Sequence, residues 1–389
     1  MKGEEKGKRM QVQIKPALLT WACERGGRDA GAFAGKFPQL DRWLSEEKKP
    51  TLKQLEKFAN ATHTAIGYLF LDEPPVENVP IPDLRTIGNL RIGHPSPDLL
   101  DTLYLCQQRQ EWYRDFARTL RQPALGFVGS ATLSDDIVLT ARKIRDILGF
   151  DLDARANMGT WTEALRRFIE QADDIGILVM CSGVVSNNNR RALDPEEFRG
   201  FSISDELAPL VFINGKDTKS AQMFTLAHEL AHIWLGESGL TDVEPVSDPQ
   251  NDIESWCNRV AAELLVPLSV LKNELSTRAG LADEVKRLTR RFKVSSLVIL
   301  RRIYDAGGLT REQLGREYRR ELAQLRDVPA GTGGNFYLTQ AARVSKRFAR
   351  AVMVSTWEGQ SSFTEAFRLL GCKKMATFRE FGHNIGMTF

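Results

Sequence analysis

Two histidines four residues apart in an apolar run constrain this chain more than any other feature. They are His228 and His232, in the segment Phe224-Thr-Leu-Ala-His-Glu-Leu-Ala-His-Ile-Trp-Leu235. On an α-helix, residues four apart lie on one face. Both imidazoles can therefore reach a single metal ion, at the bond length of about 2.0–2.1 Å that zinc requires. The apolar residues around them predict that this helix is buried in a core.

The residue after the first histidine makes the pattern more specific. Glu229 completes the order His-Glu-x-x-His, which is typical of zinc metallopeptidases. A carboxylate at this position can take a proton from a water on the ion, whose pKa zinc lowers from about 15.7 to roughly 7. The alternative is a chance pair of histidines on a core helix. Only five histidines occur in the whole chain, which makes chance the weaker explanation.

Zinc needs a third protein ligand and leaves a fourth position open for water. A glycine and a third histidine at positions 235 and 238 would extend the pattern, but Leu235 and Ser238 stand there. We therefore expect an acidic ligand further along the chain. Glu254 is preferred because it shares a helix face with Asn258 and with the small Ala261, which permits close approach to the first helix. The other acidic candidates are Glu237, Glu244, Asp248 and Glu263.

Taken together, these segments resemble the ImmA/IrrE family of metallopeptidases. The resemblance is carried by Phe201-Ser-Ile-Ser204, Ala208–Asn214, the His-Glu-x-x-His segment and Glu254-xxx-Asn258-xx-Ala261-Ala262. It implies that His228, His232 and Glu254 bind zinc, with manganese as an alternative ion, and that Glu229 is the catalytic base. Cys257 departs from the alanine that the family often has, and as a thiolate it could block the open metal position. Cys181 is a second candidate for that role.

The expected fold class is α+β, mostly helical, with a small β-sheet in a zincin-like core and helical flanking domains. Helices are expected at 97–120, at 161–172 and from a Ser134 cap to Leu148, and strands at 176–181, 198–204 and 209–213. The last strand is predicted to expose an edge that forms one wall of a cleft and holds an extended peptide.

The positions of the prolines and the distribution of charged residues suggest four segments. Residues 1–75 read as several short helices and resemble an XRE-type helix-turn-helix bundle. Residues 76–125 form a proline-rich linker and a helix. Residues 126–306 form the metallopeptidase domain with trailing helix-turn-helix-like helices, and 307–389 form a basic helical C-terminal domain.

Two regions are candidates for nucleic-acid binding. In the N-terminal bundle the contacts would come from Gln39, Arg42, Lys48 and Lys49. Residues 311–389 carry thirteen basic side chains against seven acidic ones, with aromatic residues interleaved. The alternatives are a protein-interaction module for the first region and an ordinary amphipathic surface for the second.

Composition excludes several classes of protein. The chain is 42% apolar and 26% charged, and its net charge of +3 is too small for a generally basic nucleic-acid binder. Five cysteines without CxxC pairing fit the reducing cytoplasm. The charged N-terminus lacks a signal peptide, and no apolar run is long enough to span a membrane, so we expect a cytoplasmic protein without membrane contact.

The preferred function is a zinc-dependent endopeptidase that makes limited cuts in a partner protein. The resemblance points to an XRE-type repressor or an antitoxin encoded nearby as the substrate, in a stress response. Two alternatives remain. The chain could be a DNA-binding transcriptional regulator with a structural metal site, or the toxin component of a toxin–antitoxin pair.

Overall fold

The computed structural model describes residues 11–27, 29–83, 95–241, 251–276, 280–326 and 336–387. The chain divides into two compact units, Met1–Pro80 with Arg91–Asp101 and Ile81–Leu90 with Thr102–Phe389. Many helices and one small mixed sheet confirm the predicted α+β class. None of the helices within the described ranges has the length and apolar character needed to cross a membrane.

The N-terminal unit contains five short helices around an aromatic core. They are α1 (Pro16–Arg25), α2 (Ala30–Ala34), α3 (Leu40–Leu44), α4 (Leu52–Ala61) and the 3-10 helix η1 (Ile66–Phe70). Thr51 caps α4 in a capping box with Gln54. In the core, Phe58 contacts the rings of Phe37 and Trp43.

The second unit is built on a four-stranded sheet, β1 (Leu178–Ser182), β2 (Gly200–Ile203), β3 (Leu210–Asn214) and β4 (Gly239–Thr241). The strand order is β1-β3-β2-β4, with β1 parallel to β3 and the other pairs antiparallel. The predicted exposed edge at 209–213 is wrong. β3 lies between β1 and β2 and is buried throughout, because its uninterrupted apolar run is covered on both faces.

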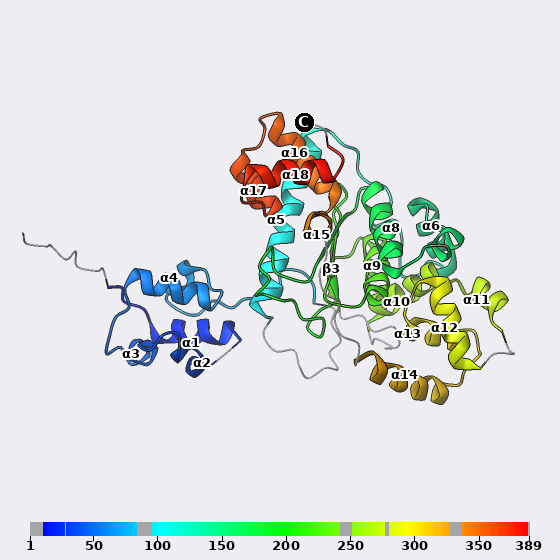
Figure 1. Cartoon of the computed structure of the whole chain (residues 1–389), viewed down its shortest axis with the longest axis horizontal. Helices are drawn as coiled ribbons and strands as arrows, with labels where there is room; N and C mark the ends of the chain where they lie inside the picture. Colours follow the sequence, from blue (N-terminus) through cyan, green and yellow to red (C-terminus); the bar gives the residue numbers. More distant parts are fainter. Residues whose placement is uncertain are drawn as a thin grey trace, which may run out of the picture. The chain divides into compact units, whose positions relative to one another are not determined.

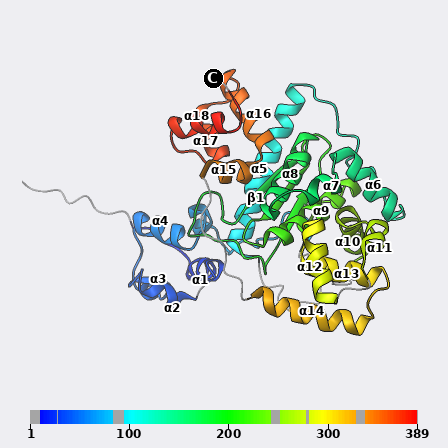
Figure 2. The same cartoon turned by 45° about the vertical axis from the view of Figure 1, so that its right-hand side comes forward.

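Helices cover both faces of this sheet. In Figures 1 and 2 the sheet lies between α5 (Pro97–Thr119) and α15 (Phe336–Val344) on one side and α8 (Trp161–Asp174) and α9 (Lys219–Leu235) on the other. Next to α9 packs α10 (Asp252–Leu265), which also contacts α6 (Ile137–Leu148). The remaining helices of this region are α7 (Leu152–Ala156), α11 (Leu268–Glu274), α12 (Leu281–Phe292), α13 (Ser296–Asp305) and α14 (Arg311–Arg326).

Helix α9 is the central element of the second unit. The Thr218 side chain caps its start by accepting from the Ala221 N–H, and Gly236 ends it in the left-handed conformation with φ 75°. Every residue from Gln222 to Trp234 is buried. By contrast, the predicted Ser134 cap of α6 is wrong. Asp136 caps that helix, because its carboxylate accepts from the Leu139 N–H while Ser134 lies two residues too early.

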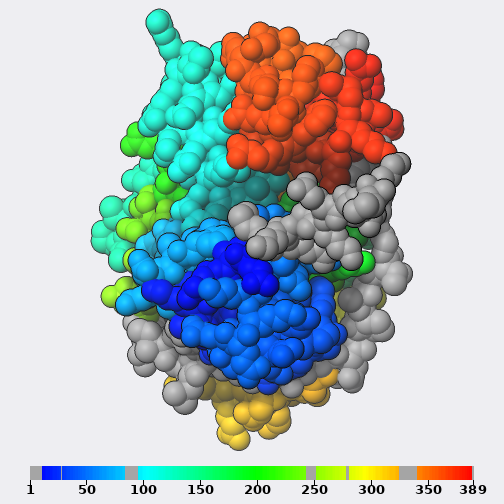
Figure 3. All heavy atoms as spheres, turned by 90° about the vertical axis from the view of Figure 1, so that its left-hand side faces the viewer, coloured from blue at the N-terminus to red at the C-terminus, as the bar shows by residue number. Residues whose placement is uncertain are grey.

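Three C-terminal helices, α16 (Lys346–Trp357), α17 (Phe363–Leu370) and α18 (Met375–Asn384), form an aromatic cluster around Phe378. In Figure 3 they form an orange-to-red body beside the cyan α5. Buried Arg109 of α5 donates from Nε to the Leu369 carbonyl at the end of α17 (3.0 Å). That contact satisfies a helix C-terminus with a cation.

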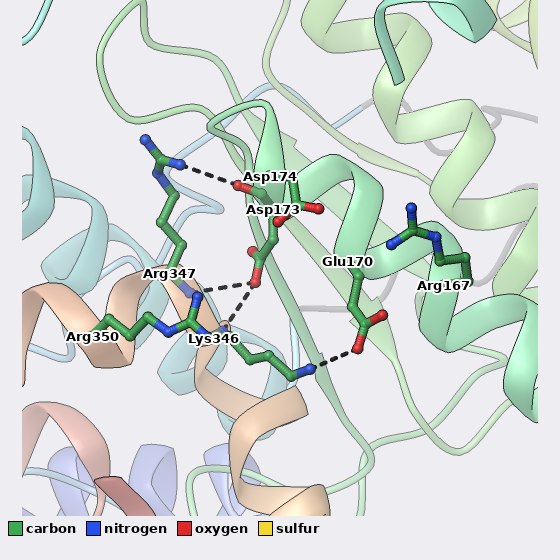
Figure 4. Close-up of a pocket in the computed structure, with 7 residues that line it drawn as sticks. All are labelled: Arg167, Glu170, Asp173, Asp174, Lys346, Arg347 and Arg350. Atoms are coloured by element: carbon green, nitrogen blue, oxygen red, sulfur yellow. Dashed lines mark hydrogen bonds and ion pairs between the residues drawn. The ribbon is translucent and has the colours of Figure 1, made fainter. Parts of the chain in front are cut away.

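The start of α16 is fixed by a carboxylate from α8. Asp173 accepts from the Ser345 hydroxyl (2.8 Å) and from the Lys346 N–H (3.0 Å), while Lys346 Nζ pairs with Glu170 (2.6 Å). Figure 4 shows Glu170, Asp173 and Lys346 at a charged pocket of about 350 Å³. The pocket marks the seam between α8 and α16.

Candidate metal centre

His228 and His232 lie on one face of α9 and converge with Glu254 of α10. The two Nε2 atoms are 2.9 Å apart. His228 Nε2 lies 3.3 Å from Glu254 Oε2, and His232 Nε2 lies 3.1 Å from Glu254 Oε1. All three residues are buried. Among the described residues, this is a group of side chains that could hold a metal ion.

The arrangement fits a small tetrahedral ion. Bonds of about 2.0–2.1 Å at tetrahedral angles place ligand atoms roughly 3.3 Å apart. The two nitrogens, 2.9 Å apart, and the Glu254 oxygens, 3.1 and 3.3 Å from them, lie close to this spacing. Two imidazole nitrogens and one carboxylate are also the donor set of zinc sites that keep one position open.

Neighbouring groups determine the hydrogen bonding and the protonation of these three side chains. His228 Nδ1 donates to Asn258 Oδ1 (3.0 Å), which leaves the Nε2 lone pair for a metal. His232 Nδ1 is buried without a hydrogen-bond partner in the described structure. Burial raises the pKa of Glu254, but the two histidines outweigh it through charge and hydrogen bonds and lower that pKa to about 2. Glu254 is therefore an anion at neutral pH.

Glu229 lies beside this group on the same helix and is fully buried. Its Oε1 accepts a hydrogen bond from the Thr241 hydroxyl of β4, whereas Oε2 is buried and has no hydrogen-bond partner among the described residues. Burial raises the pKa of Glu229 to about 7. The nearby His232 and the hydroxyls of Thr241 and Ser202 act in the opposite direction. A carboxylate with one oxygen fixed and one oxygen unpaired has the arrangement that a general base requires.

Two residues of this site were not predicted from the sequence, Thr241 and Gly200. A Cβ built on Gly200 would lie 2.6 Å from Thr225 Cγ2 and 3.1 Å from Glu229 Oε1, so only glycine fits beside the carboxylate. An isolated glycine in a strand pattern signals such a close approach, and 198–204 contains one. Thr241 gives no comparable signal, because its contact depends on β4 pairing with β2.

Two of the other acidic residues considered as the third metal ligand are not part of this group. Glu263 is buried against Arg302 in an ion pair, and Glu237 is exposed. Glu244 and Asp248 lie outside the described residues.

Cys257 is part of the hydrophobic core. Burial, together with the nearby Glu254 and Glu229, raises the pKa of its thiol. A role for Cys257 as a blocking thiolate stays a prediction. Cys181 Sγ contacts Gln222 Oε1 (3.5 Å), and burial raises its pKa too.

The four predicted DNA contacts lie in the N-terminal unit. Arg42 is exposed and pairs with Glu47 (3.5 Å), and Lys49 donates to Gln13 Oε1 (2.8 Å). Gln39 is the N-cap residue of α3, with a buried Oε1 that has no hydrogen-bond partner, and Lys48 is half-buried. Their role in DNA binding remains a prediction.

A known family model matches the part of the sequence that contains this candidate metal centre. Residues 172–304, about a third of the chain, match the family model Peptidase_M78, described as an IrrE N-terminal-like domain. Residues 344–384, which cover α16 to α18, match a domain of unknown function, DUF8813. No curated protein matched the chain. The first match spans all four residues of the candidate centre and supports a peptidase of the ImmA/IrrE type.

Proposed function

We propose that the chain is a zinc-dependent endopeptidase whose metal is held by His228, His232 and Glu254 and whose general base is Glu229. The observation that carries this proposal is the convergence of two imidazole nitrogens, 2.9 Å apart, on the two carboxylate oxygens of Glu254, which lie 3.1 and 3.3 Å from them. A second buried carboxylate, that of Glu229, lies beside this group with one oxygen that has no hydrogen-bond partner among the described residues. The match of residues 172–304 to a peptidase family supports the same chemistry.

Each residue has a distinct task in this mechanism. Bound zinc would lower the pKa of a water molecule to about 7 and polarise a peptide carbonyl. Glu229 Oε2 takes the proton of the attacking water and delivers it to the departing amine. Thr241 holds Glu229 Oε1, so that the unpaired oxygen keeps its direction.

The substrate we propose is a regulatory partner protein, an XRE-type repressor or an antitoxin encoded nearby, which is cut at few sites. This choice rests on the resemblance to the ImmA/IrrE family. DNA binding by the N-terminal unit or by the basic C-terminal region would bring the peptidase near such a partner.

Replacement of the base tests the chemistry. With zinc supplied, we expect Glu229→Gln to lower the rate of partner cleavage by about 10²- to 10⁴-fold, because general-base catalysis is lost, while zinc binding is retained. Purified protein is incubated with the products of adjacent genes, and fragments are followed by mass spectrometry. Glu237→Gln, on an exposed residue of the same region, is the matched control. Equal cleavage by Glu229→Gln and wild type would refute the mechanism.

A further inference from the structure

The edge strand at the metal centre is already paired with the chain itself. β4 is the last strand in the order β1-β3-β2-β4, and its inner edge pairs with β2. On its outer edge, the Leu240 N–H donates to the Pro82 carbonyl (2.9 Å), and Asp83 forms a parallel bridge with Leu240. Residues 81–83 form what we call the strap.

The outer edge of β4 lies next to the catalytic groups. Leu240 precedes Thr241, whose hydroxyl donates to Glu229. In a strand, side chains project above and below the sheet, whereas the main-chain N–H and C=O groups lie in its plane. The Thr241 side chain projects toward α9, and the main chain of Leu240 can therefore pair with a segment beside the sheet. An extended peptide paired with this edge would therefore lie one strand spacing further from Glu229 than β4 does.

The strap is suited to hold this edge. Pro80 and Pro82 restrict the residues before them to extended backbone, which lowers the entropic cost of pairing. Ile81 between them is buried, with 8% of its surface exposed, whereas Pro82 and Asp83 are exposed. Pro82 faces β4 with its carbonyl, and because proline has no N–H it pairs with that strand through the carbonyl alone.

We propose that the strap is an intramolecular competitor for the peptide-binding edge of the peptidase, and that a substrate must replace Ile81–Asp83 on β4. The proposal rests on the proposed function. Peptides that add to a sheet edge gain affinity from main-chain hydrogen bonds and need little specific sequence. The substrate class is therefore an extended, locally unfolded stretch of polypeptide. Pro80 ends the first of the two segments that make up the N-terminal unit, so the strap follows directly on that segment in the sequence.

The test releases the strap in the full-length protein. Ile81→Asp puts a charge at a buried position and should free the segment. Val76→Asp, at a valine with 84% of its surface exposed, introduces the same charge as the matched control. Hydrogen exchange of the Leu240 amide should be faster in Ile81→Asp and unchanged in Val76→Asp. Unchanged exchange in Ile81→Asp would overturn the proposal. A Pro80→Gly/Pro82→Gly double variant provides the same test without a buried charge.

Binding is measured apart from catalysis. In a zinc-loaded Glu229→Gln background, labelled β-casein serves as a disordered polypeptide probe. A strap that occupies the edge about nine-tenths of the time weakens apparent binding about tenfold. We therefore expect Ile81→Asp to bind casein about tenfold more tightly than the background protein or its Val76→Asp counterpart.

The outcomes separate the two proposals. Faster exchange at Leu240 with unchanged casein affinity would show that the edge does not bind peptide and would overturn the strap proposal. Tighter casein binding by Ile81→Asp supports the strap even if no variant with an intact Glu229 cleaves a peptide, in which case the proposed endopeptidase function alone fails. Tighter binding together with about tenfold faster cleavage supports both.

Discussion

The two carboxylate oxygens of Glu229 have different surroundings. Oε1 is fixed by a hydroxyl from a strand, and Oε2 is buried without a partner. An unpaired buried acceptor costs free energy, of the order of 1–3 kcal/mol. A catalytic site retains such a group when a substrate or water completes it, which is how we interpret Oε2.

Thr241 should therefore act on catalysis through Glu229. We expect Thr241→Val to lower kcat between about tenfold and a hundredfold, because the carboxylate loses its orientation, with a smaller effect on KM. Thr241→Ser keeps the hydroxyl and should retain most of the activity. The check is steady-state kinetics on one cleavable peptide. A valine variant as active as the serine variant would remove Thr241 from the mechanism.

Gly200 sets a steric limit at the same carboxylate. We expect Gly200→Ala to lower the free energy of unfolding by about 1–3 kcal/mol, because the added methyl group would lie 2.6 Å from Thr225 Cγ2 and 2.9 Å from the Phe212 carbonyl. Chemical denaturation measures the change. Gly126→Ala is the control, since nothing lies within 4 Å of its added Cβ. Equal stability of the two variants would contradict the close packing.

What the sequence predicted at this scale followed from local spacing. His228, Glu229 and His232 are four residues apart or less, and Glu254 was chosen because it shares a face with Asn258, which now contacts His228. Gly200 and Thr241 reach the site through pairing of β2 with β4, 41 residues apart in the chain. Such long-range pairing leaves no periodic signal in one sequence.

At the scale of elements, helices were easier to predict than the sheet. The prediction for α5 was 97–120 and the structure has Pro97–Thr119, because apolar periodicity and a first-turn proline define a helix locally. For β3 the strand was predicted correctly but its place in the sheet was not. An apolar run does not distinguish a central strand from an edge strand. The position of β3 in the sheet follows from its parallel pairing with β1, which is distant in the sequence.

The junction between α8 and α16 depends on one carboxylate. We expect Asp173→Ala to lower the free energy of unfolding by about 1–3 kcal/mol, because it leaves the Ser345 hydroxyl and the Lys346 N–H without their acceptor. It should also make α16 to α18 more sensitive to proteases. Asp174→Ala, which lines the same pocket, is the matched control. Identical melting and proteolysis of the two variants would argue against this contact.

At the scale of the whole molecule, the core rather than the metal holds the site together. Residues Gln222 to Trp234 of α9 are buried, and α10 packs along that helix through its own apolar face. We therefore expect the elements that carry the ligands to fold without an ion. This separates the centre from small zinc domains, which unfold when the metal is removed.

Metal removal should accordingly stop catalysis without unfolding the protein. We expect 1,10-phenanthroline to abolish cleavage while the far-ultraviolet circular dichroism stays unchanged. Zinc at a hundredfold excess over its Kd should raise stability by about 2.7 kcal/mol and restore activity. Calorimetric melting with and without zinc provides the measurement. Loss of helical signal on chelation would mean that the metal is structural.

The strap has a second consequence, for solubility. A strand edge that can receive a substrate can also pair with the same edge of another copy, which is a common route to aggregation. With the strap in place, the outer edge of β4 is covered through the hydrogen bond from the Leu240 N–H to the Pro82 carbonyl. A molecule whose strap has been released should therefore self-associate at high concentration. A variant in which the strap is permanently released should bind peptide more tightly but be less soluble.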